Sequence, residues 1–441
     1  MRRRTSLGRA LAAALLLSLP AVACTDEPPT VTGVDLFPGT LPSTFQVILP
    51  ADSFAQRIGT FAGYSGPADV GYQLVAGGFD DGLTANTLVQ LAGFPATISY
   101  TQGGTSRTDT LFTYGRGTLL ARLDTLASTS AGPVELQLWE VGQEWHPASV
   151  SWRFAVDTVG GQVPWTRPGV SRGALLARAT LTAGARAQGD SVLFALDSLA
   201  VQRIAAADFP GLLVTAAGTG ARVQLGGFQL RTGAHPETAS PDTVVAVNVS
   251  AAQATFVYDP DQPTSGGAFW EAGGIRSART LFRVDLPDSL PVCASGVCTL
   301  VPLREVALNE VSLLLRPVPV PGGFQPVGPV ATALRRVSEP ELGRRAPLGQ
   351  PVNDVLGFDA SGQPAFAGSR FVPGDSVLAI SFTGFAAGRA ASDSTSFTFA
   401  LLSDPGTLFG SPGALSFGPA WFAPDPRLRI VYTLSARPSL P

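Results

Sequence analysis

Residues 189–196 have the sequence Gly-Asp-Ser-Val-Leu-Phe-Ala-Leu, and the first five of them recur at 374–378. In the first stretch Val192, Phe194 and Leu196 stand at every second position, which is the period of a β-strand with one buried face. The second stretch begins 185 residues after the first. This repeat predicts that the chain holds two copies of a domain built from strands.

Further matches extend the repeat in both directions. Residues 241–250 resemble 426–435, and residues 211–215 resemble 396–400, both at the same offset of 185 residues. Upstream, where the offset changes, the matched pairs are 118–124 with 280–285 and 134–138 with 311–315. We therefore predict two related domains, at residues 46–250 and 251–441.

The local pattern favours β-structure in both copies. Apolar residues alternate with others at 134–138, 397–400 and 427–432, in short runs bounded by Gly, Pro, Asp and Ser. The chain contains 49 Gly and 37 Pro, which interrupt helices, and only Leu199–Ala207 suggests a helix of one or two turns. The expected fold is all-β, with two tandem antiparallel β-sandwich domains of jelly-roll-like type after a signal peptide and a short linker.

Charge and composition make several functions improbable. Charged residues form 14% of the chain, the net charge is −3, and all 30 basic residues are Arg, with no basic stripe. We expect no nucleic-acid partner. Two His and three Cys leave little for metal or nucleophile chemistry, and neither His-Glu-x-x-His nor Gly-x-Ser-x-Gly occurs. A non-catalytic protein is expected, although two carboxylates that meet in space for glycoside hydrolysis remain an alternative.

The N-terminal residues resemble a bacterial lipoprotein signal. Arg2, Arg3, Arg4 and Arg9 precede the apolar stretch 11–19, and Ala21-Val22-Ala23-Cys24 leads into a Pro-rich stretch. The resemblance implies a signal peptide at 1–23 and lipid on Cys24, and the prolines that follow predict a Pro-rich linker at 24–45. The alternative is an ordinary secretory signal in which Cys24 is incidental.

Lipidation at Cys24 implies an anchor in a membrane. No other segment is long and apolar enough to cross a bilayer. Thr25, rather than Asp, follows the Cys, and in proteobacterial lipoproteins this favours the outer membrane. The expected location is therefore the bacterial cell envelope, at the periplasmic face or the cell surface.

The other two cysteines are Cys293 and Cys298, separated by Ala-Ser-Gly-Val. In an exported chain this spacing predicts a disulfide that fixes a hairpin. Zinc is the competing interpretation, but there is no second Cys/His pair to complete four ligands.

A segment of the first copy resembles DNRLRE-type carbohydrate-binding modules, which are β-sandwiches on exported bacterial proteins. It runs from Gly142-Gln-Glu-Trp145 through Val150-Ser-Trp152 to Pro164-Trp165-Thr-Arg-Pro168-Gly169, after the 134–138 strand. The resemblance covers about 120 residues of copy one. Copy two keeps the strand order but lacks these tryptophans. The resemblance implies sugar binding by the first domain.

Aromatic side chains of this segment are candidates for sugar binding, because pyranose rings stack on indole faces while polar neighbours bind the hydroxyls. Trp139 lies on the opposite face of its strand from Leu136 and Leu138. The alternative is that the tryptophans fill a core. The candidate ligand-binding residues are Trp139, Trp145, Trp152, Arg153, Trp165 and Arg167, with Gln143, Glu144 and His146 as further polar neighbours.

No cofactor is expected. The densest acidic pairs, Asp80-Asp81 and Asp259-Pro-Asp261, have the oxygen ligands for a structural Ca²⁺, but Asp in turns of this kind needs no metal. The leading hypothesis is a lipid-anchored, non-catalytic envelope protein that binds polysaccharide through its first domain. The alternatives are a structural or assembly lipoprotein that contacts envelope proteins, and a polysaccharide-cleaving enzyme.

Overall fold

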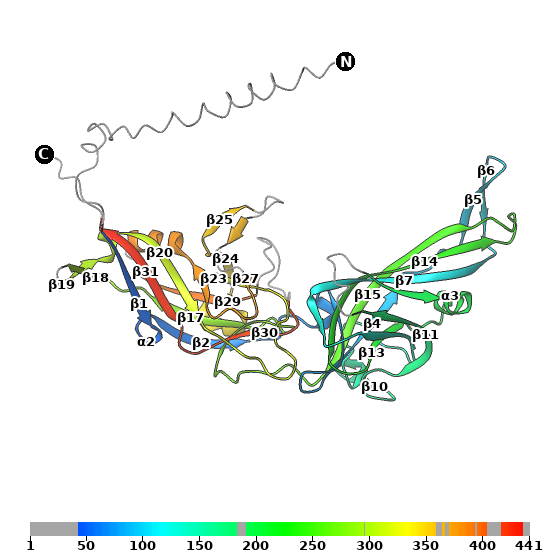
Figure 1. The fold of residues 1–441 in the computed structure, drawn as a ribbon, viewed down its shortest axis with the longest axis horizontal. Coiled ribbons are helices and arrows are strands. Elements are labelled where there is room, and N and C mark those ends of the chain that lie inside the picture. Colours follow the sequence, from blue (N-terminus) through cyan, green and yellow to red (C-terminus); the bar gives the residue numbers. More distant parts are fainter. Residues whose placement is uncertain are drawn as a thin grey trace, which may run out of the picture.

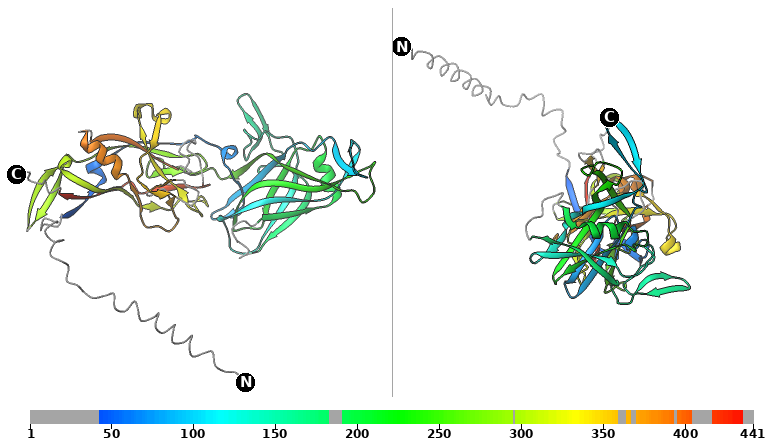
Figure 2. Two further views of the ribbon diagram at one scale, coloured as in Figure 1. Left: turned by 90° about the horizontal axis from the view of Figure 1, so that it is seen from above. Right: turned by 90° about the vertical axis from the view of Figure 1, so that its right-hand side faces the viewer.

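The computed structural model describes residues 43–182, 191–294, 296–358, 364–366, 370–392, 395–403 and 416–434. Most of these residues form antiparallel strands, which confirms the expected all-β class. The strands build two sandwich-like lobes that lie end to end along the longest axis (Figures 1 and 2). Cys24 lies outside the described residues.

Helices are few and short. None in the described ranges has the length and apolar composition needed to cross a membrane. The α-helices are α2 (Ala51–Phe54), α3 (Ser198–Ala205) and α4 (Thr383–Ala391), and the 3₁₀ turns are η3 (Pro67–Asp69), η4 (Leu303–Glu305) and η5 (Pro340–Arg345). The predicted helix at 199–207 corresponds to α3.

Lobe 1, built from β3 to β15, is one sheet folded into two layers, with strand order β11-β8-β13-β4-β15-β14-β7-β12. The first half of β15 pairs with β14 and its second half pairs with β4, so this strand passes from one layer to the other. Apolar side chains of both layers, such as Leu136 and Phe194, meet in the core between them. The predicted alternation at 192–196 is confirmed, since Val192, Phe194 and Leu196 are buried.

The strands of this sheet are β3 (Gln73–Phe79), β4 (Leu83–Leu91), β7 (Phe112–Ser130), β8 (Val134–Val141), β11 (Arg172–Leu181), β12 (Ser191–Leu196), β13 (Leu212–Ala217), β14 (Ala221–Pro236) and β15 (Val245–Asp259). Two hairpins project from it: β5 (Ile98–Gln102) with β6 (Thr105–Asp109), and β9 (Phe154–Thr158) with β10 (Gly161–Pro164).

Lobe 2 contains two larger sheets, with orders β1-β31-β20-β28 and β2-β17-β29-β23-β24, and a smaller one, β16-β30-β21. Its core includes the predicted alternating residues Phe397, Phe399, Leu428, Ile430 and Tyr432. The strands are β1 (Thr44–Pro50), β2 (Ala55–Phe61), β16 (Trp270–Gly273), β17 (Arg279–Asp285), β20 (Val306–Leu315), β21 (Pro317–Val318), β23 (Ala333–Val337), β24 (Leu348–Pro351), β28 (Leu378–Ser381), β29 (Ser396–Leu402), β30 (Pro419–Phe422) and β31 (Arg427–Leu434).

Three further strand pairs complete lobe 2: β18 (Ser289–Ala294) with β19 (Val297–Pro302), β22 (Val330–Ala331) with β27 (Arg370–Phe371), and β25 (Val355–Phe358) with β26 (Pro364–Phe366). Cys293 and Cys298 face each other in the β18–β19 hairpin and form the predicted disulfide.

The two lobes follow the same path of strand pairs. Reading both paths from the β12 and β28 ends, β12-β7-β14-β15-β4-β13-β8-β11 of lobe 1 corresponds to β28-β20-β31-β1/β2-β17-β29-β23-β24 of lobe 2. In each lobe a short helix, α3 or α4, separates β12 from β13 or β28 from β29. The strands β3 and β16 also correspond, because each ends at an Ala-Gly-Gly sequence, 76–78 and 272–274, and precedes β4 or β17.

The strand that passes between the layers is exchanged between the two lobes. In lobe 1 this strand is β15, which stands in the sequence just before β16. In lobe 2 its place is taken by β1 and β2, which stand just before β3 and pair with β31 and β17. Each sequence copy therefore begins with a strand that completes the other copy's lobe.

This exchange corrects the predicted domain boundaries. The predicted domain 46–250 includes β1 and β2, which belong to lobe 2, and the division at 250/251 falls inside β15. The domains are also not simply tandem, since lobe 1 is inserted between β2 and β16.

Some of the residue matches between the two sequence copies agree with the strand correspondence in the structure, and others do not. The offset of 185 residues correctly relates β12, α3 and β13 to β28, α4 and β29. The match of 241–250 with 426–435 is wrong, because β31 takes the place of β14 and not of β15. The upstream matches are wrong as well: 280–285 lies in β17, the counterpart of β4, and 311–315 lies in β20, the counterpart of β7.

A buried arginine joins the two lobes. Arg222, on β14, is 1% exposed, and its Nη1 donates a hydrogen bond of 2.5 Å to the carbonyl of Gly323 in lobe 2. Its guanidinium lies 5.4 Å from the ring of Phe79 and 5.9 Å from the ring of Phe417. Burial lowers the pKa of Arg222 to about 10. The surrounding apolar cluster includes Phe256 of lobe 1 and Phe417 of lobe 2.

Candidate functional site

Three of the four predicted sugar-binding tryptophans, Trp145, Trp152 and Trp165, lie in the segment 142–171 between β8 and β11, called the cover segment below, and Trp139 lies on β8. Trp145 is 6% exposed and its Nε1 donates a 2.9 Å hydrogen bond to the carbonyl of Pro210. Trp165 is 5% exposed and its Nε1 donates a 2.9 Å hydrogen bond to the carbonyl of Ser151. Both indoles are therefore buried and their N–H groups are satisfied within the protein.

The cover segment packs on the outer face of one layer of lobe 1. Leu88 on β4, Leu213 on β13 and Val257 on β15 form a second apolar cluster with Trp145 and Trp165. Apolar residues on this outer face are removed from water only because the cover segment lies over them. Trp145 and Trp165 cannot stack on a sugar in this position, which corrects their assignment as ligand-binding residues.

The other two tryptophans are half-buried at the margin of this cluster. Trp139 faces away from Leu136 and Leu138, as the strand parity predicts, and the Arg172 guanidinium lies 5.4 Å from its ring. The Trp152 ring lies against Gly169, where a Cβ atom would be 2.6 Å from the ring carbon Cη2. Gly169 also has a φ of +80°, so both space and backbone require glycine there.

Arg153 and Arg167 are exposed. Arg153 and Trp152 line a cleft of about 620 Å³ between the cover segment, β15 and the start of lobe 2. Asp157, Asp259 and Asp261 lie on its walls, so this cleft carries both signs of charge. Of the six predicted ligand-binding residues, the structure thus brings Trp152 and Arg153 together in an open cavity.

Of the acidic pairs weighed as Ca²⁺ ligands, Asp80 and Asp81 lie in a turn, whereas Asp259 is the last residue of β15 and Asp261 follows it. Asp80 and Asp81 are exposed in the β3–β4 turn and both have positive φ values, 37° and 61°. Oδ1 of Asp261 lies 3.9 Å from Nη2 of Arg276. Within the described ranges, no three His, Cys, Asp or Glu residues are placed to share a metal ion.

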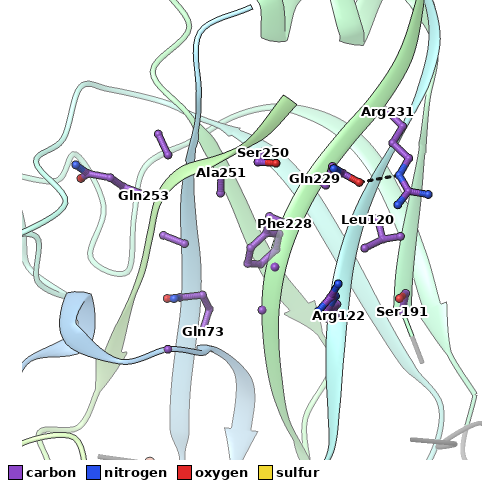
Figure 3. A pocket seen from close by; sticks show the side chains of 15 residues that line it. Gln73, Leu120, Arg122, Ser191, Phe228, Gln229, Arg231, Ser250, Ala251 and Gln253 are labelled. Atoms are coloured by element: carbon purple, nitrogen blue, oxygen red, sulfur yellow. Dashed lines mark hydrogen bonds between the residues drawn. The ribbon is translucent and has the colours of Figure 1, made fainter. Parts of the chain in front are cut away.

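A second cavity, here called the polar groove, lies on lobe 1 and has a volume of about 690 Å³ (Figure 3). It lies where β15 leaves β14. The pairing register joins residues 229–234 of β14 to β15 and residues 221–225 to β3, so 226–228 fall between the two partners. The lining residues are Gly71, Gln73, Leu120, Arg122, Ser191, Gly226, Gly227, Phe228, Gln229, Arg231, Ser250, Ala251, Ala252, Gln253 and Ala254.

Irregular pairing makes this part of the sheet hollow. The register of β14 against β7 shifts between Gly226 and Gln229, and that of β15 against β4 shifts between Ala251 and Gln253. Bulges of this kind bend strands and redirect side chains. Gly227 has a φ of +57°, and a Cβ atom there would lie 3.3 Å from Cδ of Arg122. The missing side chains of Gly226 and Gly227 leave the floor open.

The groove is polar and carries positive charge. Two Arg, three Gln and two Ser line it, and none of its lining residues in the described part of the chain is Asp or Glu. Nε of Arg231 donates a 2.8 Å hydrogen bond to Oε1 of Gln229, as Figure 3 shows. Gln73 is 5% exposed, and its side-chain Oε1 is buried without a hydrogen-bond partner in the described part of the chain. An unpaired buried acceptor is costly unless a water or ligand satisfies it.

Sequence reasoning missed this groove. Its residues come from five strands, β3, β7, β12, β14 and β15, or lie beside them. The local signal was Gly226-Gly227 in the middle of an otherwise alternating strand, which indicates a bulge.

No protein-family model and no curated protein sequence matches this chain. Among solved structures, a domain titled BspA_C_WT is 8% identical and aligns over 79% of this chain and 90% of its own length, with a TM-score of 0.15. The C-terminal domain of the Streptococcus pyogenes antigen I/II-family protein AspA is also 8% identical, over 82% of this chain and 91% of that domain, with a TM-score of 0.14. At these TM-scores the similarity carries no argument about fold or function.

Proposed function

We propose that this chain is a lipid-anchored, non-catalytic protein of the bacterial cell envelope that binds polysaccharide through the polar groove of lobe 1. The observation that carries the proposal is the composition of the groove. Amide, hydroxyl and guanidinium groups line a concave surface where the sheet is hollow, and the buried Oε1 of Gln73 has no hydrogen-bond partner among the described residues. Such groups bind sugar hydroxyls by hydrogen bonds.

The proposal keeps the predicted ligand class and the predicted domain but changes the residues. The buried Trp145 and Trp165 act in packing, and the groove residues Arg122, Gln229 and Arg231 act in binding. Trp152 and Arg153, in the cleft beside lobe 2, are the second candidate position in the same lobe.

Binding is tested by retention of the purified protein in gels that contain neutral or acidic polysaccharides. Ser250→Trp fills the groove from an exposed position, and retention should be lost. Thr105→Trp places the same ring on the exposed β6 strand and should leave retention unchanged. Loss of retention in Trp152→Ala, with none in Ser250→Trp, would move the site to the cleft.

Two other outcomes separate the competing functions. Release of reducing ends from a retained polysaccharide would identify an enzyme. Absence of retention on every polysaccharide, together with capture of a defined envelope protein after cross-linking, would favour the assembly role.

The anchor is tested separately. Cys24→Ser removes the acylated thiol and should move the protein from the membrane fraction to the soluble fraction. A substituted protein that still sediments with membranes would contradict the proposed lipidation.

A further inference from the structure

The charge of the polar groove differs from that of the chain as a whole. The full sequence contains 33 acidic and 30 basic residues, for a net charge of −3. Among the residues that the structure describes, the groove contains Arg122 and Arg231 and no acidic residue. A protein with net negative charge repels an acidic polymer over most of its surface, so a local positive groove determines where such a polymer can bind.

Neither arginine is neutralised by a described neighbour. Among the described residues, no ion pair joins Arg122 or Arg231 to a carboxylate, whereas Arg178 and Arg203 on the same lobe contact Glu135 and Glu140. Arg231 uses Nε to donate to the neutral Gln229, which holds the guanidinium in place and leaves its two terminal nitrogens for another acceptor. A guanidinium with free terminal nitrogens is suited to bind a carboxylate or sulfate in bidentate geometry.

The positions of the two arginines fit an extended ligand. Arg122 lies opposite Gly226 in the β7–β14 register, and Arg231 lies opposite Thr118. Residues 118 and 122 of one strand are separated by about 13 Å at 3.3 Å per residue. Figure 3 shows Leu120 between the two arginines and Gln229 beside Arg231. Two arginines whose backbone positions lie this far apart along the sheet can bind successive acidic groups of one polymer chain.

We infer that the ligand of the polar groove is an acidic polysaccharide, whose carboxylate or sulfate groups bind Arg122 and Arg231 while Gln73, Gln229 and Gln253 bind its hydroxyls. This inference rests on the proposed polysaccharide-binding function and specifies the class of polymer.

The test uses the full-length protein with polygalacturonate and with the same polymer after complete methyl esterification, which removes the charge and keeps the backbone. Polygalacturonate should bind at least tenfold more tightly than its ester in affinity electrophoresis or calorimetry. Its affinity should fall as salt is raised, because exposed charges are screened. Free galacturonate should bind far more weakly than the polymer.

Three substitutions locate the charge. Arg122→Gln and Arg231→Gln should each weaken polygalacturonate binding about ten- to a hundredfold, the usual range for one charge-assisted hydrogen-bonding group. Arg116→Gln removes the same charge from the same strand at an exposed position outside the groove, and should have little effect. Circular dichroism and melting of each variant check that the fold is intact.

The outcomes distinguish the inference from the function on which it rests. Equal binding of the polymer and its ester, with loss of both in Ser250→Trp, would overturn the acidic class and leave polysaccharide binding standing. Equal weakening by Arg116→Gln and Arg122→Gln would show non-specific attraction and would also overturn the inference. Binding of no polysaccharide would overturn both proposals.

Discussion

Replacing Trp145 with Ala decides whether the tryptophans of the cover segment pack or bind. Trp145 is 6% exposed, belongs to the same outer apolar cluster as Leu213, and donates a hydrogen bond to the carbonyl of Pro210. Truncation of a buried Trp costs about 3–5 kcal/mol of unfolding free energy. The Pro210 carbonyl also loses its partner, which adds about 1 kcal/mol. We expect a loss of about 4–6 kcal/mol, measured on the full chain by urea denaturation followed by circular dichroism.

Two variants control this measurement. Trp145→Phe keeps most of the packing and loses the N–H, so it should cost about 1–3 kcal/mol. Trp152→Ala removes a half-buried ring and should cost less than Trp145→Ala. The packing interpretation fails if Trp145→Ala loses less than about 1 kcal/mol of stability and at the same time abolishes retention on polysaccharide.

Three further predictions concern stability. The carboxylate of Asp354 accepts hydrogen bonds from the backbone N–H groups of Thr383 and Gly384 at the start of α4 and from the hydroxyl of Ser381. Burial alone would raise the pKa of Asp354, but these hydrogen bonds outweigh burial and hold the pKa below its usual value. Asp354→Asn should therefore lower the free energy of unfolding by about 1–2 kcal/mol at pH 7. This difference from wild type should shrink as the pH falls below about 4, because a carboxylate with a lowered folded-state pKa stabilises the fold only while it is ionised. Melting curves from pH 7 to 3 measure the difference, and a difference that does not change with pH would contradict the role given to the ionised carboxylate. The Cys293–Cys298 bridge closes a loop with a sequence separation of 5. Its reduction should lower the free energy of unfolding by only about 2 kcal/mol, measured from melting curves with and without reductant. A much larger loss of stability would mean that the bridge stabilises more than its own hairpin. Arg222→Ala removes the hydrogen bond to the carbonyl of Gly323 that joins the lobes. Limited proteolysis should therefore cut the connecting segments 62–72 and 260–269 faster than in wild type. Unchanged cleavage rates would show that the apolar cluster alone joins the lobes.

The strand-forming residues could be predicted from the sequence because their signal is local. Val192, Phe194 and Leu196 alternate within one strand, and so do Leu428, Ile430 and Tyr432; all six side chains are buried as expected. The helix α3 was likewise visible between two strands. The alternation that marks a half-buried strand involves residues only two positions apart, so it can be seen directly in the sequence.

The candidate site could not be predicted in the same way, because burial and cavities depend on distant partners. Trp145 is buried by Leu88, Leu213 and Val257, which come from three different strands. The polar groove depends on the registers of β14 with β3, β7 and β15, of which only Gly226-Gly227 left a trace in the sequence. Nothing in residues 44–50 indicates that their partner is β31 rather than β14.

The exchange of strands between the lobes also determines the order in which the protein can be completed. Lobe 1 has all its strands once residue 259 has emerged, so it can close early. Lobe 2 must keep β1 unpaired until β31 arrives, since Thr44 pairs with Thr433 and Pro50 pairs with Arg427, whereas the partner of β2 is β17, which emerges earlier. Pairing over so long a loop is slow, and an unpaired strand is open to association with other chains in the meantime. During synthesis, β1 is therefore the first strand of the described chain to appear and the last to be paired, and the interval in between is when this protein most needs protection from aggregation.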